Sequence, residues 1–234
     1  MIKIPDSQFI DLKKSEEILE RASRDGLGIS YLPTKHQVLI EKDQGWLAKI
    51  FLSWGTIWDI EKGIKPNDDA HFALVLIKSG QAAVGYFHQG KLEDHKVFRA
   101  YMIRKKQGKS QIKHLKTKGK SRAGSRIRLE ETQRFFEEIN GRLNAYDHQF
   151  PLNFWGISCS KTLWPLLFAS STPPPFDSDS KQLIELPFHV SQGSFEELQE
   201  AGRLLYGFHL LLSEAGERYF SDLFNSQEEK EEDW

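Results

Sequence analysis

The side chains with the clearest chemical signature gather in one stretch of thirty residues, from Arg99 to Arg128. This stretch holds twelve of the chain's 32 lysines and arginines and no aspartate or glutamate. The other 204 residues carry 20 basic groups against all 33 acidic ones, so the net charge of -1 conceals an acidic body at -13. Lysines and arginines that meet phosphates release condensed counterions. The concentration of basic residues in one segment therefore predicts binding to RNA or DNA. The alternative is a basic loop that is only exposed to solvent and binds nothing.

Within this basic segment, Gly108, Lys109, Ser110 and Gln111 form a short string that ends in an uncharged carboxamide. Glutamine cannot act as a general base at neutral pH, but its amide can orient water and donate hydrogen bonds to developing negative charge. Strings of this composition also arise freely in loops. The string by itself therefore does not identify a catalytic site.

The segments on either side of the basic stretch are the elements that would position it. Apolar runs separated by Ser79-Gly80 and by Gln89-Gly90 predict an antiparallel meander with strands at residues 72–78, 82–88 and 96–103. From residue 107 to residue 125 the hydrophobic residues show no regular spacing typical of a helix or a strand, which predicts a long loop. A helical period then returns, with an apolar face formed by Leu129, Phe135, Phe136, Ile139, Leu143 and Tyr146.

The rest of the chain alternates between predicted helices and strands. We expect helices at residues 6–23, 45–60 and 162–169, strands at 37–40, 153–158 and 183–190, and a last helix from the capping box of Ser194 and Glu197 to Leu212. This order predicts an α/β (α+β) fold, a mixed sheet with an antiparallel meander covered by helices in a ribonuclease-H-like order. We expect an N-terminal helical segment (1–29), one domain (30–220) with a long flexible basic loop (105–125), and an acidic C-terminal tail (221–234).

Several classes of protein are disfavoured by the sequence. The single cysteine, Cys159, excludes an internal disulfide and a cysteine-based zinc module, and no common nucleotide or zinc-protease motif occurs. We expect no cofactor and no metal, and we interpret Asp69 and His71 as parts of a turn before a strand. The apolar runs fall short of the roughly 20 residues of a membrane span, and the N-terminus lacks a signal-peptide core. We therefore expect a cytoplasmic protein without a membrane partner.

The residues around the loop, taken together, resemble a known pattern. The quoted positions are Tyr101, Arg104 and Lys106 on the strand, Gly108, Ser110 and Gln111 in the loop, and Ala123, Gly124, Ser125 and Arg128 at the start of the helix. They resemble the release-factor-like domain of the Vms/ANKZF type, the peptidyl-tRNA-cleaving factors of ribosome quality control. This domain is related to the central domain of eukaryotic and archaeal peptide-chain release factors. The family loop reads Gly-Gly-Ser-Gln, so Lys109 replaces a glycine, at a cost if the loop needs a positive φ there.

The resemblance implies a release factor that acts on peptidyl-tRNA in stalled large ribosomal subunits and needs no cofactor. It assigns the catalytic role to Gln111, on a catalytic loop with Gly108, Lys109 and Ser110. Binding of transfer RNA and ribosomal RNA would fall to the surrounding basic residues, which are Arg104, Lys105, Lys106, Lys113, Lys116, Lys118, Lys120, Arg122, Arg126 and Arg128.

The sequence leaves open which of two reactions the protein catalyses, and it allows two other functions. The nascent chain could be freed by hydrolysis of the peptidyl-tRNA ester or by cleavage of the tRNA near its CCA end, with Arg104, Lys106 or Lys109 stabilising the phosphorus-centred transition state in the second case. A noncatalytic module that binds RNA or docks on the ribosome is the alternative from another class. A ribonuclease-H-like nuclease ranks last, because the predicted strands supply few carboxylates for metal ions.

Overall fold

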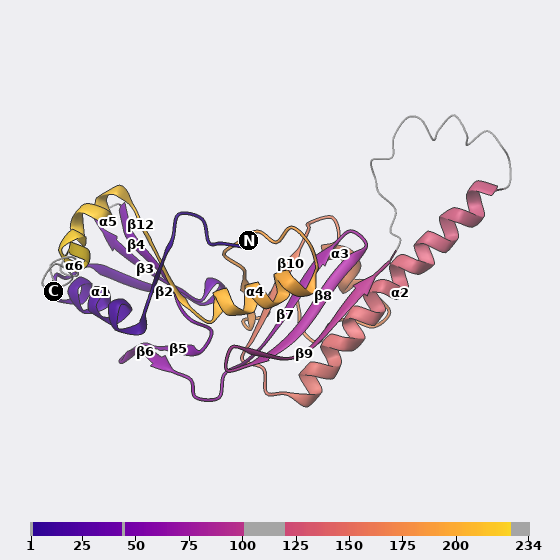
Figure 1. The fold of residues 1–234 in the computed structure, drawn as a ribbon, viewed down its shortest axis with the longest axis horizontal. Helices are drawn as coiled ribbons and strands as arrows, with labels where there is room; N and C mark the ends of the chain where they lie inside the picture. The colour runs from indigo at the N-terminus through magenta and orange to yellow at the C-terminus, as the bar shows by residue number, and fades with distance from the viewer. Residues whose placement is uncertain (1, 44, 101–119, 226–234) are drawn as a thin grey trace, which may run out of the picture.

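The computed structural model describes residues 2–43, 45–100 and 120–225, and ten of its strands form two five-stranded sheets. The two sheets lie in different parts of the molecule (Figure 1). Sheet I is antiparallel throughout, in the order β1, β12, β4, β3, β2. Its strands are β1 (Gln8–Ile10), β2 (Gly28–Leu32), β3 (Gln37–Lys42), β4 (Gly45–Phe51) and β12 (Phe208–Leu212), with a 3-10 turn, η1 (Pro33–Lys35), between β2 and β3. Helices α1 (Leu12–Arg24), α5 (Glu214–Tyr219) and α6 (Ser221–Asn225) supply apolar residues to its core.

Sheet II follows a small hairpin, β5 (Thr56–Asp59) and β6 (Gly63–Pro66), and is a mixed sheet in the order β11, β10, β7, β8, β9. The predicted meander is confirmed as β7 (His71–Lys78), β8 (Gln81–His88) and β9 (Lys91–Arg99), although the third strand, expected at 96–103, begins five residues earlier and ends at Arg99. Strand β10 (Phe154–Cys159) pairs in parallel with β7, and β11 (Leu183–Glu185) pairs in parallel with β10. Helices α2 (Lys120–Gln149), α3 (Trp164–Phe168) and α4 (Phe195–Leu205) complete this part of the chain.

Helices cover both faces of sheet II, and this explains why its central strands are apolar at nearly every position. Ala73, Val75 and Ile77 of β7 point to one face, where α2 and α3 contribute to the core. The intervening Phe72, Leu74 and Leu76 point to the other face and pack with α4. Successive side chains of a strand alternate between faces, so a strand covered on both sides reads as a continuous apolar run. The mixed α+β class that the sequence predicts is thus confirmed.

One element of the prediction is wrong: residues 45–60 form no helix but contain the strands β4 and β5. The prediction rested on Trp46, Ile50, Trp54 and Trp58, which are spaced by four. A spacing of four places residues on one face of a helix, but because four is even it also places them on one face of a strand. Trp54, in the turn between the two strands, packs edge-on against Phe72 of sheet II.

Other boundaries also differ from the prediction. Residues 8–10 form β1, and α1 begins only at Leu12, because the Asp11 carboxylate caps it by accepting the Lys14 N–H at 2.7 Å. Strand β11 ends at Glu185, two residues before Pro187, which has no N–H to donate. Helix α4 ends at Leu205, and the apolar residues expected to continue its face form β12 between β1 and β4.

The expected domain limits at residues 30 and 221 both fall on described elements. The limit at residue 30 lies inside β2, so residues 1–29 contribute β1, α1 and the start of β2 to sheet I. The limit at residue 221 coincides with the start of α6, while residues 226–234 lie outside the described part. The N-terminal segment is thus part of sheet I, because β1 pairs with β12 and β2 pairs with β3.

Candidate functional site

The predicted catalytic segment is inserted between β9 and α2, at one end of sheet II. Strand β9 forms the edge of the sheet and pairs with β8 from His88 opposite Lys91 to Gln81 opposite Arg99. The next residue, Ala100, donates its N–H to the Gly80 carbonyl at 2.9 Å. The chain therefore leaves the sheet beside the turn that joins β7 to β8.

Helix α2 receives the chain on the other side of the segment and is the longest helix described, at 30 residues. Such a helix is about 45 Å long. Its C-terminal half is anchored on sheet II by buried side chains, which are Phe135, Phe136, Ile139, Leu143 and Tyr146. The buried amide of Asn140 also donates to the carbonyls of Leu167 and Thr172, at 2.8 Å each. The N-terminal turns project beyond the sheet (Figure 1).

Most of the residues predicted to form the site lie outside the described residues. These are Gln111, with Gly108, Lys109 and Ser110, and the basic residues Arg104, Lys105, Lys106, Lys113, Lys116 and Lys118. The backbone of Lys120, Arg122, Arg126 and Arg128 belongs to α2. Residues 120–125, expected to be loop, are therefore helical. Lysine, arginine and alanine have high helix propensity, and Gly124 is the one strongly unfavourable residue among them.

The end of sheet II from which the segment departs is closed by the start of α4. Ser194 caps this helix as predicted, since its hydroxyl accepts the Glu197 N–H at 3.2 Å. The Glu197 carboxylate accepts the N–H groups of Ser191 and Gln192, three and two residues before Ser194, whose own N–H is the partner in the standard capping box. A Cβ on Gly193 would lie 2.7 Å from the Leu76 carbonyl oxygen, so glycine is needed for the backbone to pack against the sheet.

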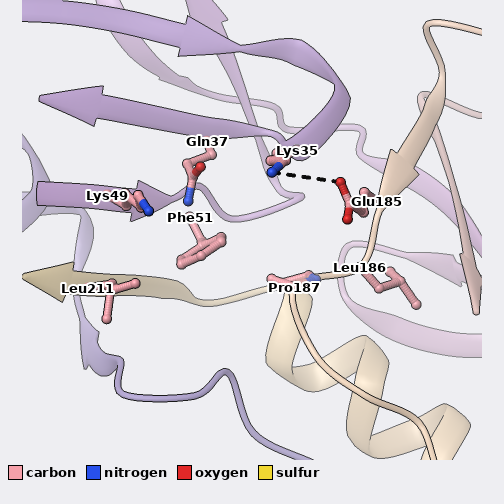
Figure 2. A pocket seen from close by; sticks show the side chains of 8 residues that line it. All are labelled: Lys35, Gln37, Lys49, Phe51, Glu185, Leu186, Pro187 and Leu211. Carbon is pink, nitrogen blue, oxygen red and sulfur yellow. Dashed lines mark ion pairs between the residues drawn. The ribbon is translucent and has the colours of Figure 1, made fainter. Parts of the chain in front are cut away.

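A pocket of about 210 Å³ lies elsewhere, where sheet I meets the edge of sheet II formed by β11 (Figure 2). Lys35 Nζ lies 3.9 Å from a carboxylate oxygen of Glu185. Figure 2 marks this ion pair and shows Lys49 and Phe51, both on β4, beside it. This edge is opposite to the edge formed by β9. The pocket contains none of the predicted site residues, and it is smaller than most ligand sites, which measure about 300–1,000 Å³.

A cluster of two histidines and a carboxylate lies at the other end of β7 and β8. One oxygen of Asp69 is 2.9 Å from Nε2 of His71 and 3.0 Å from Nε2 of His88. The hydrogen bond from His88, more than that from His71, holds the pKa of Asp69 below its usual value. Sequence reasoning noted Asp69 and His71 but missed His88. The signal was available, because a two-residue turn at 79–80 places residue 88 opposite residue 71.

Cys159, at the end of β10, is half-buried. Burial raises the pKa of its thiol to about 12, against a small opposing effect of Lys78. The reactive form of cysteine is the thiolate, which is scarce at neutral pH under these conditions. Cys159 therefore lacks the activation that a nucleophilic cysteine requires.

A match to a family model defines the class of this chain as a release-factor-like domain. Residues 72–211 match the family described as Bacteroidetes VLRF1 release factor, from the second residue of β7 nearly to the end of β12. Because the match covers more than half of the 234 residues, the chain belongs to this family. The resemblance drawn from the strand, loop and helix residues is confirmed, and the family assigns the chain a release-factor role in translation.

Solved structures were also found to be similar to this chain. One, titled "Vms1 mitochondrial localization core", is 13% identical with a TM-score of 0.43, and the match covers 88% of this chain and 91% of that one. Another, an archaeal translation termination factor, is 14% identical with a TM-score of 0.34, and the match covers 68% of this chain and 39% of that one. No curated protein matches the chain. Within the described residues, no helix combines the length and the apolar character of a membrane span.

Proposed function

We propose that this chain frees nascent chains from peptidyl-tRNA on stalled large ribosomal subunits, and that Gln111 is its catalytic residue. The observation that carries the proposal is the string Gly108 to Gln111, inside the matched family region and inside the acid-free basic segment. The segment is inserted between β9 and α2, two elements that are anchored on sheet II. We expect the protein to act in the cytoplasm.

The chemistry of the target explains why a carboxamide suits this role. The ester of a peptidyl-tRNA lies in a narrow cavity walled by RNA, where bulk would collide and a fixed charge would carry a heavy desolvation cost. Glutamine is neutral and reaches beyond the small Ser110. Its backbone N–H or side-chain amide would orient the attacking water and stabilise the oxyanion that develops at the ester carbonyl.

The basic residues would supply the affinity that brings the carboxamide to its target. Twelve lysines and arginines between Arg99 and Arg128 can contact phosphates of the tRNA acceptor stem and of ribosomal RNA. These contacts position the protein without reading sequence, which suits a factor that acts on any stalled chain. Lys109, in place of the family glycine, adds one more cation beside the glutamine.

The test is single-turnover release of a labelled nascent chain from isolated large subunits that carry peptidyl-tRNA. We expect Gln111→Ala to lower the release rate at least a hundredfold, the scale on which a lost oxyanion donor acts. Gln107→Ala, the same substitution four residues earlier in the same segment, should release at the wild-type rate. Equal rates for wild type and Gln111→Ala would remove the role assigned to the Gln111 carboxamide.

The same reaction decides which bond is cut. An intact CCA end on the product tRNA indicates ester hydrolysis, whereas a shortened end indicates cleavage of the tRNA itself. In the second case the ribose 2'-OH attacks the adjacent phosphate, and Arg104, Lys106 or Lys109 would stabilise the charge at phosphorus.

The acid-free basic segment also favours a second candidate, a noncatalytic module that binds RNA or docks on the ribosome. This candidate predicts binding that weakens steeply with salt and no released chain with any peptidyl-tRNA. Absence of product from the wild-type protein, with binding intact, would establish this alternative.

A further inference from the structure

The side chains of Asp69, His71 and His88 converge on one point at the end of sheet II where β7 begins and β8 ends. His71 and His88 stand directly opposite each other in the antiparallel register. Their rings stack with centroids 4.4 Å apart and planes 10° apart. Both Nε2 atoms face the same oxygen of Asp69, and the three potential ligand atoms lie within 4.8 Å of one another.

We propose that Asp69, His71 and His88 form a binding site for a divalent transition-metal ion of the zinc type. Zinc takes imidazole nitrogens and carboxylate oxygens at about 2.0–2.2 Å in tetrahedral geometry, which sets neighbouring ligand atoms roughly 3.4 Å apart. The present separations from Asp69, 2.9 and 3.0 Å, require shifts of a few tenths of an ångström to reach that value. Two imidazoles favour zinc over magnesium and calcium, which prefer ligand sets made of oxygen alone.

A hydrogen bond at Nδ1 of His71, the ring nitrogen that does not face Asp69, orients this histidine for metal binding. The Tyr86 hydroxyl lies 2.7 Å from Nδ1 of His71 and can accept a hydrogen bond from an Nδ1–H. In the metal-bound state His71 would carry its proton on Nδ1, and Nε2, which now donates to Asp69, would offer its lone pair to the ion. Tyr86 is 5% exposed, and its ring stacks on Phe150 with centroids 3.6 Å apart. The partner that orients His71 is therefore itself held in place by the core.

The backbone around the cluster is also held by hydrogen bonds. The Asn153 side-chain oxygen accepts the His71 N–H at 2.8 Å, and the Asn67 side-chain oxygen accepts the Asp69 N–H at 3.2 Å. On the other strand, Gln89 donates its N–H to the Ala70 carbonyl at 2.9 Å. The turn before β7 and the turn after β8 are thus tied together, so the three ligands are arranged before any ion binds.

One side of the cluster is open, which leaves a position for a water molecule as the fourth ligand. The Asp69 and His88 side chains are 74% and 40% exposed, whereas the His71 side chain is 11% exposed. The end of β8 next to the catalytic segment lies seven residues away, roughly 23 Å at the rise of a strand. The ion would therefore brace the end of sheet II opposite to the end from which the chain enters the basic segment.

The experiment is a calorimetric titration of the EDTA-treated full-length protein with Zn²⁺, and separately with Mg²⁺. We expect one equivalent of Zn²⁺ to bind, no Mg²⁺ to bind, and Zn²⁺ to raise the melting temperature by mass action. His88→Gln and Asp69→Asn should each weaken Zn²⁺ binding at least tenfold and remove the thermal shift. His189→Gln, which changes an exposed histidine on the segment after β11, should bind like the wild type.

Co²⁺ adds a readout that does not depend on stability. A site of this kind should give visible absorption bands typical of four-coordinate cobalt with the wild type and with His189→Gln, and not with Asp69→Asn. The proposal is overturned if the wild type binds no Zn²⁺. It is also overturned if both ligand variants bind as tightly as the wild type, because the ion would then lie elsewhere, for instance at His114.

Discussion

His36 is a buried histidine whose protonation state is fixed by its two hydrogen-bond partners. Its Nε2 lies 3.0 Å from the Ser53 carbonyl oxygen, which can only accept, so Nε2 carries the proton. Its Nδ1 then accepts from the Tyr31 hydroxyl at 2.7 Å. The ring is 1% exposed and packs 4.8 Å from the Phe154 ring of sheet II. Burial lowers the pKa of His36 to about 4.

This pKa predicts that acid destabilises the protein. Between pH 6.5 and pH 4 the unfolded chain binds a proton at His36 that the folded chain does not, so the contribution is complete above pH 6.5 and is lost as the pH falls to 4. The expected loss in the free energy of unfolding between pH 7.5 and pH 5 is about 2 kcal/mol. Urea denaturation at the two pH values measures it.

The control for His36 separates its titration from that of other groups. Asparagine tolerates the left-handed backbone at this position, where φ is 46°, and does not titrate. His36→Asn should therefore lose stability at pH 7.5 but show a pH dependence smaller by about 2 kcal/mol. His209, whose pKa burial also lowers, supplies the dependence that remains. An unchanged pH dependence in His36→Asn would show that His36 is not the group responsible.

At the scale of elements, the prediction is correct where the residue pattern fits only one type of secondary structure. The meander of β7, β8 and β9 is marked by turn residues, of which Gln89 and Gly90 have the positive φ angles of 51° and 75° that a tight hairpin needs. The strands β4 and β12 were missed. Their apolar spacing fits a helix equally well, and they are strands because each supplies the other with a partner in sheet I.

Two helical glycines should respond in opposite ways to the same substitution. Gly141 of α2 is exposed, and a Cβ built there has no atom within 4 Å, so Gly141→Ala should stabilise the protein by about 0.5–1 kcal/mol. Gly202 of α4 is buried, and its Cβ would lie 2.1 Å from Cε1 of Phe87. Gly202→Ala should destabilise by about 1–3 kcal/mol or more. Urea denaturation tests both, and a change of the same sign would contradict the packing described for α2 and α4.

At the scale of the whole molecule, the sequence yields a prediction for the catalytic segment that does not depend on the path of the chain. The location of Gln111 came from charge counting and a family pattern, neither of which depends on knowing the strands of sheet I. The cluster of Asp69, His71 and His88 was missed for the opposite reason. It depends on the pairing of β7 with β8, which places His88 opposite His71, seventeen positions away. The sequence shows this proximity only when the register of the hairpin is counted outward from the turn at 79–80.

The separation of charge between body and segment predicts how the protein's affinity for ribosomes depends on salt. The logarithm of the binding constant should fall linearly with the logarithm of salt concentration, by about 0.7–0.9 per phosphate contact. Replacing Lys113, Lys116, Lys118 and Lys120 with glutamine should make this slope shallower, by up to about one unit per lost contact, and leave the melting temperature unchanged.

A matched variant tests whether position or total charge is responsible. Lys13, Lys62, Lys91 and Lys161 are exposed on the acidic body, and their replacement by glutamine changes the net charge by the same amount. Because exposed charges farther apart than about 10 Å are largely screened at 0.1 M salt, this variant should keep the wild-type slope. Gln111→Ala should also bind with the wild-type slope while failing to release the nascent chain, since a neutral amide makes no counterion-releasing contact. Equal changes in slope for the two lysine variants would mean that binding responds to overall charge and that the basic segment has no special role.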